Sequence, residues 1–496
     1  MNSDELKGCD VESNEESVSD ISASELIREL HWKDTIFSSV LRFLMIPGLF
    51  AIPVLLIGEG VPSIILYSFA LFFGVALIIR SFGSIEYLMA SFIFYIPLSK
   101  MMPISIAPMV NGTNIFILLL LALMFLRKKE QGDGLGQSNK LLIFFAVLTS
   151  LSGITALFAM GPQHIFGMYL LEYKSWVDQL IFILIFSKLI SSRAMAVRMM
   201  GYMVFACLLV TVLGFQEALD KAGRATIDAS RIEGPLLQPN NFAAFLVYSI
   251  GPILGLSLIW LKSSKILFVA AYLLIWLKVL LATFSRGAYL GFLCGCIAFS
   301  YVRGIRFSIL MAVLAGSILL VFPQLLPDSI VDRFSSTRSD TSYETGGLDK
   351  SSHSRLIIWN AAIEITKESP ILGKGFKVFP VIMEKYLEQE VEERDPHNMY
   401  FYMSTQMGIP AVILFIALMA QLYFRGRSVY SQYETPFIKA IGIGAVCTAI
   451  AVIVINVFGS RMVNLEVTAF VWLYSIVLAK LTDEKQRTIS EDSGFS

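Results

Sequence analysis

The sequence predicts an all-α polytopic membrane protein with about 12–14 transmembrane helices and one large, partly helical extracytoplasmic loop. Hydrophobic residues make up 55% of the chain and charged residues only 16%, whereas ordinary soluble domains carry about a quarter charged residues. The mean hydropathy is +0.68. Apolar runs fill most of the chain, and a single long polar stretch, residues 323–399, interrupts them. An ordinary soluble domain is therefore excluded.

The N-terminal region, residues 1–36, is predicted to be a disordered cytoplasmic tail. Residues 1–24 are acidic and serine-rich, and no basic segment leads into an apolar core, so a cleaved signal peptide is not expected. The net charge of zero hides an uneven distribution and says little about partners. The five cysteines lie outside the polar stretch, so a disulfide framework is excluded there. No Cys/His set has the spacing of a zinc site.

Apolar segments long enough to cross a bilayer, about 20 residues, recur along the chain. They group into a transmembrane bundle at 37–322 and C-terminal transmembrane helices at 400–481, followed by a second cytoplasmic tail at 482–496. The predicted spans, about fourteen and several of them short, are 40–57, 62–79, 84–98, 113–126, 141–159, 174–190, 199–219, 241–260, 266–284, 288–303, 307–322, 400–424, 437–458 and 466–480.

Basic residues in the short connections predict the orientation. An even number of spans places their clusters on one side of the membrane together with both termini, and lysine and arginine enrichment marks the cytoplasmic side. Residues 323–399 then lie outside, as long loops cross largely regardless of charge. The clusters are Arg80, Arg127-Lys128-Lys129, Lys188/Arg193/Arg198, Lys262/Lys265, Arg303/Arg306, Arg425/Arg427 and Lys480/Lys485/Arg487.

Within the outer loop, residues 355–367 show apolar positions at helical spacing, with Ser354 as a possible N-cap and Pro370 beyond the end. Arg355 would then lie in the first turn, where the helix dipole disfavours a cation unless an anion is nearby. The alternatives are a phosphate-binding arginine and a surface arginine paired with an acidic neighbour such as Asp349.

Two further loop segments have alternative interpretations. Gly373-Lys374-Gly375 could let the backbone approach a ligand or could simply stop a helix. A second helix-like stretch, 378–394, ends in an acidic run that is expected to be solvated rather than a cation site, because residues two apart on a helix diverge. The run comprises Glu388, Glu390, Glu392, Glu393 and Asp395.

His397 is the histidine best placed for chemistry. It follows a proline and adjoins a predicted span, which suits proton transfer at the membrane surface. A capping or interfacial role is the alternative. Arg286 lies between two apolar spans with almost no loop, and a charge so close to hydrocarbon is costly and usually functional.

Upstream, Arg231-Ile-Glu-Gly-Pro and Gln238-Pro-Asn-Asn241 precede another span. Their amides could bind sugar hydroxyls or simply turn the chain.

The ordered set of these motifs resembles the O-antigen ligase and O-antigen polymerase family of bacterial envelope glycosyltransferases. The resemblance covers roughly residues 200–480, and hydropathy alone extends it to the earlier spans. Family members commonly have about twelve spans. The matching elements are Arg231-Ile-Glu-Gly with Pro239-Asn240, Thr283-Phe-Ser-Arg-Gly, Ser354-Arg355 with Trp359, Pro370 with Gly373-Lys-Gly375-Phe, His397-Asn398 and Gly408.

The resemblance implies transfer of an oligosaccharide from an undecaprenyl-pyrophosphate carrier to a hydroxyl acceptor, without a nucleotide sugar, cofactor or metal. It implies that Arg286 and Arg355 bind the pyrophosphate and that His397 is the general base. By the same resemblance, the expected substrate-binding residues are Arg231, Asn240 and Asn398. The expected location is the bacterial cytoplasmic (inner) membrane, with the active loop on the extracytoplasmic side.

The predicted function is a polymerase that joins undecaprenyl-pyrophosphate-linked repeat units into a surface polysaccharide, with inversion at the anomeric carbon. One alternative is a ligase that hands the glycan to lipid A core or another acceptor. The other is a membrane transporter or lipid-linked glycan flippase, which should need charges along a central cavity, whereas here they concentrate outside. Expected partners are the lipid-linked donor, the glycan acceptor, membrane lipid, and flippase and chain-length regulator proteins; nucleic acid is not expected.

Overall fold

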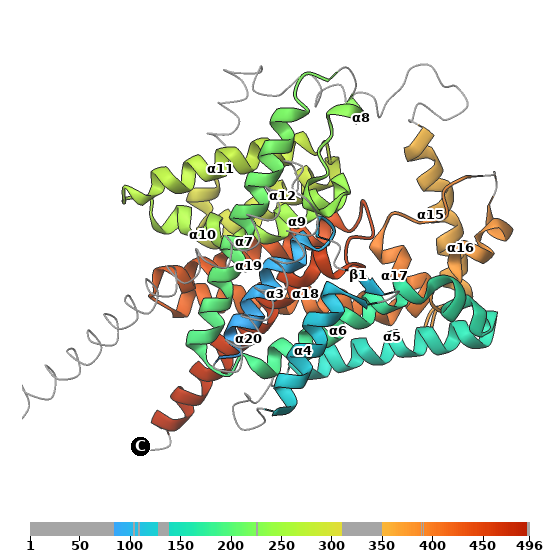
Figure 1. Cartoon of the computed structure of the whole chain (residues 1–496), viewed down its shortest axis with the longest axis horizontal. Helices are drawn as coiled ribbons and strands as arrows, with labels where there is room; N and C mark the ends of the chain where they lie inside the picture. Colours follow the sequence, from blue (N-terminus) through green and yellow to red (C-terminus); the bar gives the residue numbers. More distant parts are fainter. Residues whose placement is uncertain are drawn as a thin grey trace, which may run out of the picture. The chain divides into compact units, whose positions relative to one another are not determined.

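The computed structural model describes residues 84–102, 105–107, 110–126, 138–224, 227–309, 350–387, 389 and 391–493. Its elements follow the sequence colours of Figure 1. In chain order they are α3 (Glu86–Leu98), β1 (Ser105–Ala107), β2 (Val110–Asn111), α4 (Gly112–Leu126), α5 (Ser138–Met160), η2 (His164–Tyr169), α6 (Leu170–Leu189), α7 (Arg193–Asp220), α8 (Ile227–Ser230), η3 (Gly234–Leu236), α9 (Pro239–Ser249), α10 (Gly251–Ile259), α11 (Lys265–Ala282), α12 (Arg286–Arg303), α15 (Lys350–Glu368), α16 (Phe379–Ile382), η6 (Met383–Tyr386), α17 (Met399–Met407), α18 (Ile409–Gln432), α19 (Pro436–Ile455) and α20 (Leu465–Ser493).

Seven helical stretches of the described chain are long and apolar enough to cross a membrane. Together they confirm the predicted all-α polytopic class, because a bilayer requires backbone polar groups to be satisfied within each helix. The seven are Lys140–Met160, Arg193–Asp220, Pro239–Ile259, Lys265–Ala282, Ile409–Gln432, Pro436–Ile455 and Leu465–Asp483.

The other predicted spans have varied outcomes. Two of them, 84–98 and 113–126, correspond to the shorter apolar helices α3 and α4. The spans predicted at 174–190 and 288–303 are the helices α6 and α12, which do not belong to the set of seven. Residues 40–57, 62–79 and 310–322 lie outside the described residues.

A short antiparallel hairpin links α3 and α4. Its strands β1 and β2 pair Ser105 with Asn111 and Ala107 with Val110. These are the only strands among the residues that the structure describes, so the helical class is unaffected.

Helix α19 lies at the centre of the packing and contacts α10, α12 and α18. Small residues allow its backbone to approach α10: a Cβ on Gly444 would lie 2.3 Å from the carbonyl carbon of Gly251. Close helix packing through small residues is typical of membrane interiors, where van der Waals contact supplies much of the association energy. This packing fixes the position of α19, which ends at Ile455. The residues discussed in the next subsection lie just beyond that end.

The predicted span 400–424 is broken into α17 and α18 at Gly408, which has φ 81°. A Cβ at this position would lie 2.2 Å from the carbonyl oxygen of Ile371. The Ile409 N–H donates to the Pro370 oxygen at 2.7 Å. The break therefore gives the polar segment a fixed attachment to the helices.

Helix α15 belongs to the long polar segment, residues 350–398 of the described chain, which we call the outer segment after its predicted side. It begins at Lys350, so the prediction of Ser354 as its N-cap is wrong. Arg355 lies in the second turn, and the argument from the dipole of the first turn does not apply to it. The helix does end before Pro370, as predicted. Local sequence did not reveal the start because Lys350, Ser351 and Ser352 carry no apolar periodicity.

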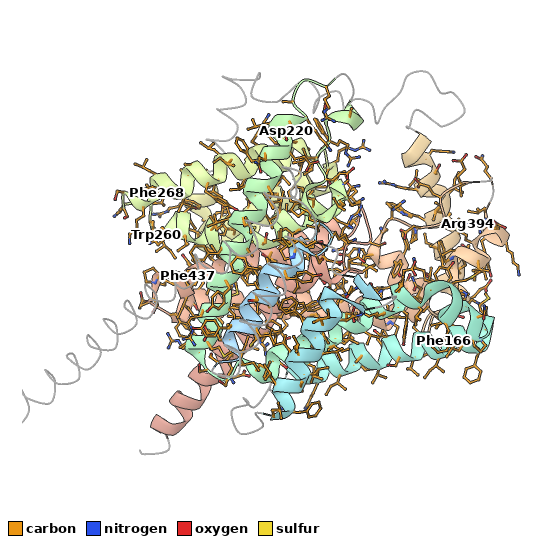
Figure 2. All side chains as sticks on the ribbon, viewed as in Figure 1. Phe166, Asp220, Trp260, Phe268, Arg394 and Phe437 are labelled. Carbon is orange, nitrogen blue, oxygen red and sulfur yellow. The ribbon has the colours of Figure 1, made fainter. Side chains whose placement is uncertain are left out.

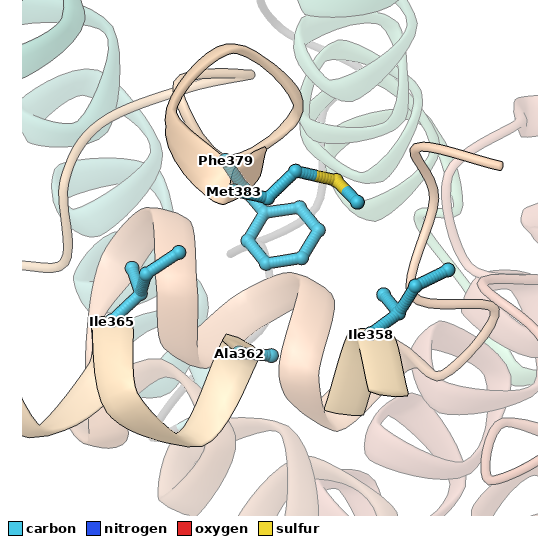
Figure 3. Packing of buried hydrophobic residues seen from close by; sticks show 5 residues of the cluster. All are labelled: Ile358, Ala362, Ile365, Phe379 and Met383. Atoms are coloured by element: carbon cyan, nitrogen blue, oxygen red, sulfur yellow. The ribbon is translucent and has the colours of Figure 1, made fainter. Parts of the chain in front are cut away.

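The outer segment has a hydrophobic core of its own, shown in Figure 3. One face of α15 packs on α16 and η6. The predicted helix over 378–394 is thus only a short pair of turns over 379–386, and residues 391–398 are irregular. The buried core residues are Ile358, Ala362, Ile365, Phe379 and Met383.

The Gly373-Lys374-Gly375 segment docks on protein backbone. Lys374 N–H donates to Thr405 O at 2.8 Å, and Phe376 N–H donates to Ser152 O at 2.9 Å. A Cβ on Gly375 (φ 101°) would lie 2.5 Å from the backbone nitrogen of Ala156. These glycines permit close approach of the outer segment to α17 and α5, which accounts for their presence without a ligand.

We expect Phe379→Ala to loosen the outer segment, because truncating a buried phenylalanine typically costs about 3–5 kcal/mol and Phe379 is only 1% exposed. Limited proteolysis of the purified protein should cleave between residues 350 and 398 faster than in the wild type. The matched control is Val381→Ala, at a side chain that is 45% exposed. Equal cleavage rates in both variants would contradict an independent core.

Candidate functional site

His397 lies on the irregular connection between η6 and α17, and its backbone is held from two sides. The indole Nε1 of Trp359 donates to Pro396 O at 2.7 Å, and the His397 N–H donates to Asp395 Oδ1 at 2.7 Å. The residue has φ 46°, an uncommon conformation for a non-glycine residue. Its side chain is 34% exposed. The backbone at His397 is therefore held in place, while the imidazole ring is partly exposed.

Two carboxylates flank the imidazole. Glu393 Oε2 lies 3.5 Å from Nε2, and Asp395 Oδ1 lies 3.6 Å from Nδ1. At these separations the carboxylates can balance a positive charge on the ring by Coulomb attraction. The arrangement suits a histidine that gains a proton during a reaction.

Asn398 acts as the N-cap of α17. Its Oδ1 accepts from the N–H groups of Tyr400 at 2.9 Å and Phe401 at 3.3 Å. The residue is 5% exposed. The capping role that was the alternative for His397 is thus performed by its neighbour Asn398, whose side-chain oxygen is already occupied.

Arg286 is the first residue of α12 and follows Ser285, which is the N-cap. Arg231 lies against the segment that leads into this helix. Its Nε donates to Thr283 O at 3.1 Å, and the neighbouring Ile232 N–H donates to Ala282 O at 3.1 Å. Two motifs that are distant in sequence, those of Arg231 and Arg286, therefore lie side by side.

Asn240 lies in the first turn of α9, which Gln238 caps through a contact from its Oε1 to the Asn241 N–H. The Asn240 Oδ1 accepts from Nη2 of Arg231 at 3.2 Å. In the described structure this amide orients an arginine, a role that neither alternative for the motif included. An amide oxygen holds a guanidinium in place without cancelling its charge.

Arg355 is half-buried on α15, and its Nε is a buried donor. Within the described parts of the chain this Nε has no hydrogen-bond partner. An unsatisfied buried donor costs free energy and is uncommon, which makes Arg355 a candidate for ligand binding.

Arg461, on the connection between α19 and α20, was not selected from the sequence. Burial lowers the pKa of its guanidinium first, and the positive charges of Arg355 and Arg231 lower it further, while Tyr248 and Asp395 act in the opposite direction. Such mutual effects require proximity. Arg231, Arg355 and Arg461 thus form one electropositive cluster beside Asp395.

The remaining segments meet at the same end of α19. Met399 N–H, two residues after His397, donates to Asn456 O at 2.8 Å. A Cβ on Gly287 would lie 2.8 Å from the Cβ of Phe458, which places the start of α12 against the Arg461 connection. We call the residues at this junction the candidate site: Arg231, Arg286, Arg355, His397 and Arg461.

A signal for Arg461 was present in the sequence. Gly459-Ser460-Arg461 separates two strongly apolar segments with a short connection, which is the criterion that selected Arg286.

The acidic run before His397 is partly described. Glu388 and Glu390 lie outside the described residues, and Glu393 and Asp395 flank the histidine. Arg394, labelled in Figure 2, pairs with Glu384. No group of three or more His, Cys, Asp or Glu residues that could hold a metal ion occurs among the residues that were searched, which are the described ones.

A separate groove of about 270 Å³ lies between α15 and the α17–α18 break. Its lining is mainly apolar and includes no residue of the candidate site, so it suits hydrocarbon rather than pyrophosphate. It is lined by Ile363, Thr366, Lys367, Pro370, Phe401, Ser404 and Ile409.

Residues 270–416 match the Wzy_C family model, which is described as O-antigen ligase. The resemblance drawn from the motifs is confirmed over that range, which contains Arg286, Arg355 and His397. The matched segment is thus similar to ligase- and polymerase-type envelope polysaccharide enzymes, and the long apolar helices are those of a multi-pass membrane protein. No curated protein matches the chain.

We expect Trp359→Phe to slow glycan synthesis about fivefold, because one hydrogen bond to Pro396 contributes about 1 kcal/mol. Phenylalanine retains the aromatic packing on Phe401, whose ring centroid lies 5.6 Å away. Polysaccharide yield at equal protein level measures the effect. Trp260→Phe, on the connection after α10, is the control. An unchanged yield would show that the Trp359 contact does not position His397.

Proposed function

We propose, starting from the matched domain, that the protein is a polymerase-type glycosyltransferase that joins undecaprenyl-pyrophosphate-linked repeat units into a surface polysaccharide. The observation that supports this most is the cluster of arginines in which consecutive asparagines of α9 hold Arg231 at 3.2 Å and Arg461 at 3.0 Å. A lipid pyrophosphate is the anion that such a cluster suits at a membrane, since guanidiniums bind phosphate oxygens in forked geometry.

In the proposed reaction, His397 removes the proton from the acceptor hydroxyl. The hydroxyl oxygen forms a bond to the anomeric carbon of the donor sugar. The bond from that carbon to the pyrophosphate breaks, and its electron pair leaves with undecaprenyl pyrophosphate. Attack opposite the leaving group inverts the anomeric centre.

Each candidate residue has a proposed role in that reaction. Arg286 and Arg355 hold the phosphate oxygens as negative charge builds on the leaving group. Arg231, held by Asn240, contributes to substrate binding, as does Asn398 through the amide nitrogen of its side chain. Glu393 and Asp395 balance the imidazolium that forms on His397.

We propose that the outer segment faces the extracytoplasmic side of the cytoplasmic membrane. The support is the distribution of basic residues over the short connections. The lipid-linked donor and the glycan acceptor would meet the candidate site there. A flippase that delivers the donor and a chain-length regulator are the protein partners expected for this reaction.

The second candidate is a ligase, which the description of the matched family favours. Both enzymes use the same donor chemistry and differ in the acceptor. The glycan profile of a deletion strain separates them. Loss of long chains with single units retained on the acceptor identifies a polymerase. Loss of all glycan from the acceptor, with lipid-linked polymer accumulating, identifies a ligase.

His397→Ala should reduce glycan synthesis by about 10²–10⁴-fold, the usual contribution of a general base. Membrane insertion and protein level should remain normal, because the side chain is partly exposed and packs no core. Polysaccharide from cells with equal amounts of protein measures the effect. His353→Ala, also on the outer segment, is the matched control. Full synthesis by the His397 variant would remove this residue from the mechanism.

We expect the purified enzyme to keep turning over lipid-linked donor in excess EDTA. Arginines supply fixed positive charge, whereas Mg²⁺ sheds its water reluctantly. The measurement is the product formed with and without chelator. The expectation would be overturned if activity were lost in EDTA and returned on adding Mg²⁺, which would assign charge neutralisation to a metal.

A further inference from the structure

The connection between α19 and α20, residues 456–464, lies outside the matched domain and forms a wall of the candidate site. Its start is fixed by Asn456, a fully buried residue that ends α19. Asn456 Oδ1 accepts from the Arg461 N–H at 3.0 Å, and its Nδ2 donates to Tyr248 Oη at 2.9 Å. The backbone of Arg461 is therefore held by a rigid group.

The guanidinium of Arg461 folds back over its own connection. A Cβ on Gly459 would lie 2.5 Å from Arg461 Nε, so a glycine is needed for this conformation. The Arg461 Nη1 donates to Asn241 Oδ1 at 3.0 Å. Consecutive asparagines of α9 thus orient different arginines, Asn240 holding Arg231 and Asn241 holding Arg461.

The choice of an amide partner matters for the charge. A carboxylate would neutralise the guanidinium, whereas an amide orients it and leaves its charge for another partner. Arg461 is buried near Arg355 and Arg231. Burying like charges together is unfavourable unless anions balance them, and Asp395 is a single carboxylate near three guanidiniums.

Two buried donors belong to the segments that carry Arg461 and Arg355. The Oγ of Ser460, adjacent to Arg461, is buried, as is Nε of Arg355. Neither has a hydrogen-bond partner among the described residues. Buried donors are normally satisfied, and phosphate oxygens are suitable acceptors for both.

We propose that Arg461, oriented by Asn241, binds the pyrophosphate of the lipid-linked donor, with Ser460 Oγ as an adjoining hydrogen-bond donor. This assignment rests on the proposed function and adds a residue beyond the matched domain. As the glycosyl bond breaks, the pyrophosphate gains negative charge, and a preoriented guanidinium stabilises that charge without reorganisation. Arg461 is thereby a substrate-binding residue.

The test measures binding of undecaprenyl pyrophosphate and of uncharged undecaprenol to the full-length protein in lipid nanodiscs. Arg461→Gln should weaken pyrophosphate binding by about 10- to 100-fold, the range for a charged hydrogen bond. Arg461→Lys should lose a smaller part, because lysine keeps the charge but lacks the fork. Undecaprenol binding should be unchanged. Lys385→Gln, which removes one charge from an exposed site on η6, is the control.

Asn241→Asp separates charge from scaffold. Aspartate has almost the same shape and strengthens the contact with Arg461, so the connection stays in place while the guanidinium is neutralised. We expect weaker pyrophosphate binding in this variant as well. Wild-type binding by a folded Asn241→Asp protein would show that Arg461 only ties the connection to α9, and would overturn the proposal. This variant also decides the question if Arg461→Gln fails to fold.

The same measurements separate a wrong role for Arg461 from a wrong function for the protein. If the wild type does not bind undecaprenyl pyrophosphate, the proposed function fails, whatever the variants at Arg461 and Asn241 do. If the wild type binds and His397→Ala is inactive while both the Arg461→Gln and Asn241→Asp proteins bind normally, only the role of Arg461 is wrong.

Discussion

The candidate site depends on the hydrogen bonds of Asn456, a fully buried side chain at the end of α19. Its Nδ2 bonds Tyr248 on α9, its Oδ1 bonds the Arg461 N–H, and its carbonyl oxygen bonds the Met399 N–H. Three segments are fixed to one residue in this way, and two of them, those of Tyr248 and Met399, are distant from it in sequence. Replacing a group with this many partners leaves several buried polar atoms unsatisfied, which is more costly than losing a single contact. Because α19 is itself packed mainly on α10, α12 and α18, this junction can be rigid.

Arginines in this protein are held in two different ways. Arg198 on α7 forms two hydrogen bonds of 2.7 Å with the carboxylate of Glu86, an arrangement that satisfies its charge within the fold. Arg461 instead donates to the neutral amide of Asn241, although Arg355 and Arg231 lie near it. The first arrangement stabilises helix packing. The second retains positive charge at the junction, which a fold would not keep for stability alone.

Sequence patterns predicted the helical membrane class and drew attention to Arg286, Arg355 and His397 as unusual charges near apolar segments. Their roles stay proposals. The sequence patterns did not predict structure where a residue's conformation depends on contact with a segment distant in sequence. Gly373 and Gly375 contact the backbone of α17 and α5, and no local spacing reveals such docking. The break of α17 and α18 at Gly408 likewise follows from an approach of Ile371. Arg461 could have been found by the criterion that selected Arg286, since both are charges on short connections between apolar helices.

Docking of the outer segment explains how residues of a long polar segment can belong to a site at helix ends. The segment attaches through Lys374 and Phe376 on one side and Ile409 on the other. Between these attachments, α15 contributes Arg355 and, through Trp359, the support of Pro396 beside His397. The positive φ of His397 is maintained by these contacts, since strained conformations persist only where surrounding structure determines them. Arg355 and His397 therefore reach the helix-borne arginines through one docked unit, so disturbing the attachment should affect both groups together rather than either alone.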